Sequence, residues 1–512
     1  FVMHSNVATG LTSDVAYTAQ QYWTSPRGQG VRTTFTTGEA VASGDILSLT
    51  SADTVKRHAP TALPTSFDQT TSTVSSVNVS SGTQVRASRL VMLASTLYAN
   101  FQYDYNGGTP RGFCTRVPLT PSTGVLGSLA GGTALTTTPA GTPSTVDAVA
   151  MDSTRALTCV SLANAFSGGV VTLSSAVTPG TTVSIDTSSV SEGFCEYISD
   201  SHVLFFARET SSASIDFYKY TASSSTLTSS STGTVTTLTG KTFVLKGVKK
   251  FYGTQYFLFI VQNTTDATAQ ALIAHYNTTT STFSTVGTLT ALTGSQQLSS
   301  DVYAPAVFAE LSATQMIVAC PTSSTAGKYL LVYRSDSSST TPLFGTITSM
   351  TATSAQGGYS LTRANDRCAY LNTTNSTTVT SKLLEVNAAG TDLSERVSAT
   401  HTSATDTEGP TYSFHVSPMR MGLGGIELTS EDIYAKTAEY TLPVPMGVAA
   451  VAASASSTVD AITNGYCSSV SGLTAATKYY ADIGGLLTSD SSGTPDKVGI
   501  AKDATEIIVK SW

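Results

Sequence analysis

Residues 149–162 read VAMDSTRALTCVSL. A short apolar segment ends at Met151, four polar or small residues follow, and a more strongly apolar segment begins after Arg155. Short apolar runs separated by residues that favour turns are typical of β-strands joined by a tight connection. This stretch therefore predicts two adjacent strands with a turn at residues 152–155.

The same pattern recurs along the chain, and a repeat of this kind decides the fold. Its turn markers are spaced 47 to 66 residues apart, at Arg89, Arg155, His202, Gln255, Gln315, Arg367 and Arg420. The clearest further copies are EYISDSHVLFFA (196–207), KKFYGTQYFLFI (249–260), AELSATQMIVAC (309–320) and LTRANDRCAYL (361–371). Two weaker copies are RASRLVML (86–93) and SPMRMGLGG (417–425).

Each unit continues with a third strand that is rich in Tyr or Val, such as SIDFYKY at 214–220, and with a fainter fourth strand. Four antiparallel strands in about 50 residues make one blade of a β-propeller. Seven markers predict an all-β chain with about seven four-stranded blades over residues 65–442, with six or eight blades as the neighbouring possibilities. A solenoid is a minor alternative, because solenoid repeats are usually shorter or helical.

Charge and composition exclude some classes of function. The chain has 512 residues, 27 Lys and Arg, 34 Asp and Glu, and a formal net charge of -7. A nucleic-acid-binding protein needs a basic face and a polybasic anchor needs clustered cations, so both classes are disfavoured. No apolar run reaches roughly 18 residues, so we expect no membrane insertion. The opening residues Phe1–His4 do not resemble a signal peptide.

Six cysteines occur, and none belongs to a CxxC pair. Cys159, Cys320 and Cys368 lie within apolar, strand-like runs. We therefore expect most of the cysteines to be reduced and buried, where the thiol behaves as a small apolar group.

The segments outside the repeat have a different period. Residues 38–58 read GEAVASGDILSLTSADTVKRH, and residues 446–510 contain SGLTAATKYYADIGGLLTS and KVGIAKDATEIIVK. These segments resemble a module of bacteriophage tail-fibre and other appendage proteins. The residues that carry the resemblance are Gly38, Ala40, Gly44, Asp45, Ile46, Leu49, Gly472, Leu473, Thr474, Thr477, Tyr479, Tyr480, Asp482, Gly485, Leu487, Thr488, Val498, Gly499, Ala501, Thr505 and Val509.

This resemblance implies a small β-barrel or sandwich module, made of residues 35–64 and 443–512, in which the propeller is inserted or which flanks it. Residues 1–34 are interpreted as an N-terminal arm. In this arm Tyr17, Tyr22 and Trp23 would dock on a neighbouring subunit, or the arm would instead pack on its own domain. The pattern consists of turn glycines and strand residues, so it implies no catalytic residue.

A search for chemistry finds no catalytic, cofactor or metal motif. The sequence has no HExxH, GxSxG, GxxxxGK[ST] or DxDxDG pattern, and its only tryptophans, Trp23 and Trp512, lie outside the repeats. A glycosidase needs two facing carboxylates, but the candidates are scattered singly: Glu196, Glu209, Asp301, Glu310 and Asp366. Turn aspartates such as Asp152, Asp200 and Asp366 are explained by local hydrogen bonding. We therefore expect no enzyme and no cofactor.

Binding of a glycan is compatible with a neutral, hydroxyl-rich surface. Tyr98, Tyr103, Tyr105 and Asn106 form the candidate glycan or partner surface, in and beside the NFQYDYNGG stretch of the first repeat. The alternative is a hairpin in which these rings pack across strands.

The first hypothesis is a structural protein of a virion: a tail fibre, spike or capsid-attached appendage that assembles with other virion proteins and attaches to a host-surface glycan. Such appendages are often trimeric, and we expect a homo-oligomer, although no heptad pattern fixes its number. A secreted or cell-surface lectin-like propeller is the alternative. A polysaccharide-degrading enzyme is disfavoured by the missing carboxylate and Trp signatures.

Overall fold

In the computed structural model, the described residues form β-strands and two short 3-10 helices, η1 (Ala94–Thr96) and η2 (Ile483–Gly485). In the described part of the chain, no helix is long and apolar enough to cross a membrane. The structure describes residues 31–509 except for 52, 68, 71–83, 107–108, 129, 136–142, 163–164, 188–189, 210–212, 239–241, 265–267, 293–304, 323–325, 352–358, 376–377, 403–410, 428–431 and 493–494.

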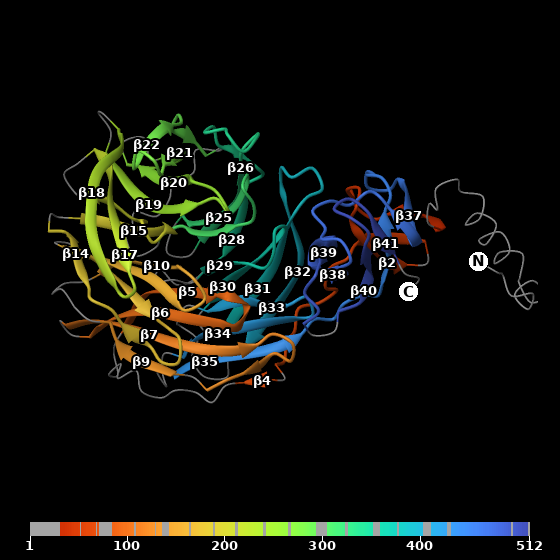
Figure 1. Ribbon diagram of the computed structural model, residues 1–512, viewed down its shortest axis with the longest axis horizontal. Coiled ribbons are helices and arrows are strands. Elements are labelled where there is room, and N and C mark those ends of the chain that lie inside the picture. Colours follow the sequence, from red (N-terminus) through yellow and green to blue (C-terminus); the bar gives the residue numbers. More distant parts are fainter. Residues whose placement is uncertain are drawn as a thin grey trace, which may run out of the picture.

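Seven antiparallel sheets are arranged around a common centre, beside a smaller domain (Figure 1). We number these sheets as blades 1 to 7 in the order of their first strands. The first strands are innermost, because those of neighbouring blades contact one another. They are β5 (Gln84–Leu93), β10 (Pro143–Ala150), β15 (Val190–Ser199), β19 (Phe243–Lys250), β24 (Val307–Glu310), β29 (Tyr359–Arg363) and β33 (Tyr412–Ser417).

The other strands follow outward in chain order, except that the outermost strand of blade 7 comes from the beginning of the chain. The second strands are β6 (Leu97–Asn106), β11 (Arg155–Leu162), β16 (His202–Glu209), β20 (Tyr256–Asn263), β25 (Gln315–Pro321), β30 (Cys368–Asn375) and β34 (Arg420–Glu427). The third strands are β7 (Thr109–Thr120), β12 (Ala165–Thr172), β17 (Ser214–Ser223), β21 (Thr268–Asn277), β26 (Ala326–Tyr333), β31 (Thr378–Val386) and β35 (Asp432–Glu439).

The outermost position is one strand in blades 3, 6 and 7 and two short segments in the other blades. In order these are β8 (Val125–Leu126) with β9 (Ala130–Ala134), β13 (Thr178–Pro179) with β14 (Val183–Asp186), β18 (Thr226–Thr237), β22 (Thr282–Val286) with β23 (Thr290–Ala291), β27 (Leu343–Phe344) with β28 (Thr348–Thr351), β32 (Leu393–Thr402) and β4 (Gln69–Thr70).

The prediction of an all-β propeller with about seven four-stranded blades is confirmed. The predicted turns also hold for most repeats, since β11, β16, β25 and β34 begin at the markers Arg155, His202, Gln315 and Arg420. The marker at Arg89 is wrong. Arg89 lies within the inner strand β5, and the turn of that blade is η1, five residues later.

The ring is closed by a strand from the beginning of the chain. The strand β4 precedes blade 1 in sequence but pairs with β35 of blade 7, with Gln69 opposite Thr437 and Thr70 opposite Lys436. Blades 7 and 1 then share a buried cluster that includes Tyr98 and Phe414. Blade 7 therefore combines segments that are more than 300 residues apart, which ties the ring together.

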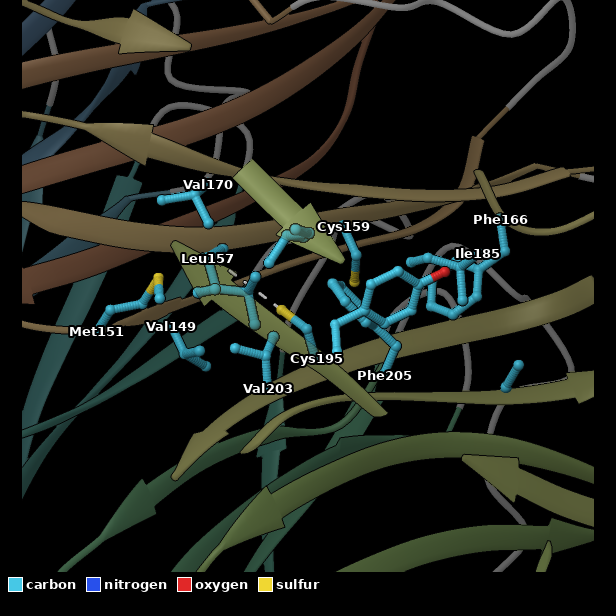
Figure 2. Packing of buried hydrophobic residues seen from close by; sticks show 14 of the residues in the cluster. Val149, Met151, Leu157, Cys159, Phe166, Val170, Ile185, Cys195, Val203 and Phe205 are labelled. Atoms are coloured by element: carbon cyan, nitrogen blue, oxygen red, sulfur yellow. Dashed lines mark hydrogen bonds between the residues drawn. The ribbon is translucent and has the colours of Figure 1, made fainter. Parts of the chain in front are cut away.

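The apolar core lies between neighbouring blades. Figure 2 shows the cluster between blades 2 and 3, in which the ring of Phe205 lies 6.0 Å from that of Phe166 in an edge-on arrangement. Burial of both faces explains the continuous apolar runs of the second strands, because each sheet is covered on both sides. The six cysteines are free and buried, which confirms the expectation for Cys159, Cys320 and Cys368.

Close approach of the blades requires glycine at two positions of this cluster. A Cβ atom at Gly168 would lie 2.5 Å from the Phe205 ring, and one at Gly193 would lie 2.3 Å from the Phe166 ring. Since real Cβ atoms do not approach other atoms this closely, the aromatic rings occupy the space that these glycines leave.

Side chains at the start of the second strands tie each blade to the next one. Each donates a hydrogen bond to a backbone carbonyl in the connection between the third and fourth strands of the following blade. The four ties, from blades 2 to 5, are Arg155 to Ser224 (3.4 Å), His202 to Thr278 (2.9 Å), Tyr256 to Ser338 (3.3 Å) and Gln315 to Gly390 (2.8 Å).

The small domain is one sheet built from both ends of the described chain. Its strand order is β1-β3-β2-β36-β37-β41-β40-β38-β39, and β1 also pairs with β37, which closes the first five strands into a barrel. The bounds are β1 (Val31–Thr37), β2 (Ile46–Ser51), β3 (Thr54–Arg57), β36 (Pro445–Ala449), β37 (Thr458–Cys467), β38 (Lys478–Asp482), β39 (Leu486–Thr488), β40 (Lys497–Ala501) and β41 (Ile507–Val509).

Blade 6 holds the small domain through buried ion pairs. Arg57 of β3 lies 2.7 Å from Glu385 of β31, and Arg396 of β32 pairs with both Glu385 and Glu39. Burial would raise the pKa of Glu39, but Arg396 and Arg57 outweigh it and hold that pKa below its usual value. Buried charges that are paired in this way resist separation, because either partner alone would be left without its counter-ion.

In blade 6, the residues just before the second strand also contact the small domain. Arg367, immediately before β30, donates to Asp45 at 2.7 Å and to the Gly484 carbonyl at 2.8 Å. Asn365 donates to Asp482 and to the Ile483 carbonyl, both at 3.0 Å. At this turn the hydrogen-bond partners thus come from the small domain and not from the next blade.

Candidate binding site in the central channel

The inner strands enclose a cavity of about 350 Å³. Residues of all seven blades line it, from β5, β10, β15, β19, β24, β29 and β33 or directly beside them. Phe194, Phe308, Tyr359 and Tyr412 supply aromatic groups to this lining. A cavity of this size falls at the lower end of the range for small-molecule sites.

Five charged residues also line the cavity, each from a different blade. They are Arg89, Asp147, Lys249, Glu310 and Arg363. In the order of the blades these charges alternate in sign, and blades 3 and 7 contribute none of them.

Lys249 is at the centre of one ion-pair cluster. Its Nζ lies 3.0 Å from Oε1 of Glu196 and 3.8 Å from Oε1 of Glu310, so these two oxygens belong to carboxylates on opposite neighbouring blades. Burial alone would lower the pKa of the Lys249 ammonium, but the carboxylates of Glu196, Glu310 and Asp147 outweigh it and raise that pKa. The charged form of Lys249 is therefore favoured in the channel wall.

The pKa values of the carboxylates of Glu196 and Asp147 are raised as well, which for an acid favours the uncharged form. Burial raises the pKa of Glu196, and Lys249 and Lys250 offset part of this rise. Burial also raises the pKa of Asp147, against the charges of Arg89 and Lys249. Asp147 lies 3.4 Å from Nε of Arg89 and accepts a 3.2 Å hydrogen bond from the backbone N–H of Cys195 on the next blade.

One lining residue, Arg363, contacts an exposed aromatic residue. The guanidinium carbon of Arg363 lies 3.8 Å from the ring centroid of Tyr252, and Arg363 also pairs with Asp366. Tyr252 belongs to the turn after β19, and its side chain is 50% exposed.

The residues predicted for a glycan surface do not form this site. Tyr98 is buried at 1% exposure, with its ring 4.9 Å from that of Phe414, so the expectation of an exposed Tyr98 is wrong. Tyr103, Tyr105 and Asn106 are in the second half of β6, and the structure describes only their backbone. Tyr17, Tyr22 and Trp23 lie outside the described residues.

The turn aspartates are in part as predicted. Asp152 accepts hydrogen bonds from the backbone N–H groups of Thr154 and Arg155, as expected for a turn residue. Asp200 and Asp366 instead accept from the side chains of Arg155 and Arg363.

The channel charges were visible in the sequence but not as a group. Glu196 and Glu310 are scattered singly in the sequence, yet both contact Lys249 in the structure. The sequence signal for these residues is their position in the repeat. A charged residue precedes the turn marker by four to six residues in four repeats, at Glu196, Lys249, Glu310 and Arg363. Within the described residues, no group of three or more His, Cys, Asp or Glu side chains could hold a metal ion.

The comparisons with known proteins do not place this chain in a family. No protein-family model matches the chain, and no curated protein matches it. Among solved structures, the fucose-specific lectin from Aleuria aurantia is 11% identical and covers 63% of this chain and 97% of its own, with a TM-score of 0.35. The periplasmic gluconolactonase of Pseudomonas aeruginosa is 12% identical over 62% of this chain and 86% of its own, also at 0.35.

A third similar structure is the Nup133 β-propeller domain of Vanderwaltozyma polyspora, which is 7% identical and covers 69% of this chain and 100% of its own, with a TM-score of 0.36. Similarity this low carries no argument about function. The functional argument therefore rests on the channel itself.

Proposed function

We propose that the chain is a lectin-like binding protein whose central channel takes a neutral, hydroxyl-rich ligand such as a small saccharide. The observation that carries this proposal is the set of paired acids and bases around the cavity. Arg89 pairs with Asp147, Lys249 with Glu196 and Glu310, and Arg363 with Asp366.

Paired charges favour a neutral ligand over a charged one. A charged ligand would compete for one member of a pair and leave the other without its counter-ion, which is costly in a poorly solvated site. A hydroxyl group can donate to Glu310 and accept from Lys249 at the same time without separating them. A saccharide presents several such groups on one small ring.

The remaining lining fits the same class of ligand. Phe308, Tyr359 and Tyr412 line the cavity beside the charged groups, and Phe308 is the least buried of the three. The Tyr359 hydroxyl donates to the Pro305 carbonyl at 2.8 Å, which fixes the orientation of that ring. Binding sites of this type combine apolar walls with a few fixed polar groups.

The test is calorimetric titration of the full chain with methyl glycosides of neutral hexoses. We expect Lys249→Met to weaken binding about tenfold, because one hydrogen bond to a charged group is worth roughly 1.5–3 kcal/mol. Lys56→Met is the matched control, since Lys56 is exposed on the small domain. Glu310→Gln, at the more exposed end of the cluster, is a milder second variant in case Lys249→Met does not fold.

Failure of every neutral glycoside to bind the wild-type chain would contradict this function. Binding of an anionic or cationic sugar in preference to the neutral ones would contradict the argument from paired charges.

We propose binding without turnover. Each carboxylate of the channel lies beside a cation, whereas glycoside hydrolysis needs a free acid and a free base on either side of the scissile bond. Incubation with oligosaccharides that bind the channel should release no reducing ends. Release that is lost in Glu196→Gln would instead assign the chain to the hydrolases.

Assembly into a virion appendage is a second proposal, and the small domain would carry it. Tyr466 and Ile508 are directly paired on β37 and β41, each with 38% of its side chain exposed, and Val451 of the same domain is 53% exposed. Neighbouring exposed apolar residues favour contact with another chain, and we commit to a second copy of this one.

The measurement is the mass of the purified protein by light scattering. We expect an oligomer that dissociates in the double variant Tyr466→Ser, Ile508→Ser. The control is Val125→Ser with Val286→Ser, two exposed apolar residues of the propeller. A wild-type chain that is monomeric at all concentrations would contradict assembly through this domain.

A further inference from the structure

Tyr252 differs from the other aromatic residues of the propeller. Among the exposed large apolar side chains of the described residues, it is the aromatic one outside the small domain. It follows Lys249 by three residues, and Gly253, with a φ of 67°, turns the chain directly after it. A tight turn thus fixes the ring close to the charged wall of the channel.

The contact between Tyr252 and Arg363 spans the channel mouth. Tyr252 comes from blade 4 and Arg363 from blade 6, and blade 5 lies between them in the ring. Arg363 itself lines the cavity. A ring that contacts it across one blade therefore lies at the entrance and not on the outer wall of the propeller.

We propose that Tyr252 is a stacking residue for the sugar, and this inference rests on the proposed saccharide function. The ring would stack on the C–H face of a pyranose at the mouth. Lys249 and Glu310 would form hydrogen bonds with its hydroxyl groups deeper in the channel. Aromatic rings contribute both a large apolar area and a defined plane to such a contact.

Arg363 prepares the ring for this role. Its guanidinium stacks on Tyr252, and its pairing with Asp366 fixes the guanidinium in turn. A side chain that is already ordered loses little conformational freedom when the ligand arrives, which favours binding. Half of the Tyr252 side chain still remains exposed for contact.

The experiment compares cyclic and acyclic ligands by calorimetry. The probes are methyl glycosides of neutral hexoses and the open-chain polyol sorbitol, which has hydroxyl groups but no rigid C–H face. We expect Tyr252→Ala to weaken glycoside binding about tenfold and to leave sorbitol binding unchanged. Tyr252→Phe keeps the ring and should bind glycosides as the wild type does.

Leu343→Ala is the matched control. Leu343 is also an exposed large apolar residue of the propeller, but it lies on the outermost strand β27. Its replacement should leave glycoside binding unchanged. Thermal unfolding of each variant verifies that the fold is retained.

The outcomes separate this inference from the proposed function. Wild-type affinity of Tyr252→Ala for glycosides would overturn the stacking role while the saccharide function stands. Tighter or faster binding by Tyr252→Ala would show that the ring obstructs the mouth, which also overturns it. Absence of binding by the wild type would overturn both.

Discussion

Asp482 is the carboxyl group of the domain junction that burial affects most clearly. It is 6% exposed, caps η2 by accepting from the Ile483 N–H at 2.8 Å, and accepts from Asn365. Burial raises its pKa to about 7, and the hydrogen bonds from Asn365 and Ile483 offset only part of that rise. The junction therefore favours the protonated acid.

This shift predicts how the stability of the junction depends on pH. The pKa is higher in the folded state than in the unfolded chain, so the contribution of Asp482 is fully present below about pH 4 and is lost as pH rises to about 7. The loss over that interval is on the order of 4 kcal/mol. The free energy of unfolding of the wild type, minus that of Asp482→Asn, should decrease over this range in denaturant titrations.

Asp152→Asn is the control, because Asp152 lies in an exposed turn. Buried histidines act in the opposite direction: burial lowers the pKa of His58 and of His415 to about 4 each, so their contributions grow as pH rises from about 4 to 6.5. For this reason the difference between wild type and variant, and not the wild-type curve alone, isolates Asp482. A difference that does not change with pH would contradict the assignment.

At the scale of elements, the turn before each second strand has two uses. In blades 2 to 5 its last residues tie one blade to the next, and in blade 6 the same position binds another domain. Arg367 reaches Asp45, whose side chain is 2% exposed. The repeat thus supplies the attachment point without any added element.

Removal of the ion pair between Arg367 and Asp45 should lower the free energy of unfolding. We expect Arg367→Ala to destabilise the junction by about 3 kcal/mol, because it leaves the buried Asp45 carboxylate without its cation. Gln315→Ala removes an equivalent tie between two ordinary blades and should cost only about 1 kcal/mol. Denaturant unfolding measures both values, and equal losses in the two variants would contradict the argument.

How far sequence predicts these elements depends on burial. The second strands were recognisable because both of their faces are covered, which gives runs such as VLFF at 203–206. The inner strand of blade 1 has the same property, since Val91 and Leu93 pack on blade 2 while Leu90 and Met92 pack towards blade 7. In sequence, β5 therefore resembles a second strand, and the repeat pattern predicts the first turn at Arg89 instead of at η1.

The candidate site was less predictable for a different reason. Its charges come from inner strands about 50 residues apart, so no local motif links Glu196, Lys249 and Glu310. Only the ring geometry brings them together. Sequence could show that a charged residue often precedes the turn, but it could not show that these residues face one space.

At the scale of the whole molecule, ring closure and domain junction lie on the same side. β4 and β35 of blade 7 are the segments through which the chain enters and leaves the propeller, and blade 6 carries the ion pairs to the small domain. Figure 1 shows the small domain next to these blades. Three ion pairs join blade 6 to the small domain: Arg57 with Glu385, Arg367 with Asp45, and Arg396 with Glu39.

This arrangement has a mechanical consequence. If the small domain is anchored and a ligand in the channel is pulled, the tension passes from the inner strands through blades 6 and 7 to the anchor, and the distant blades bear little of it. Since β4 is covalently continuous with the anchored end, stretching acts along both ends of blade 7 together and does not peel the ring open from one side. The pairing of β4 with β35, which completes the propeller, would thus also protect the ring from being pulled open.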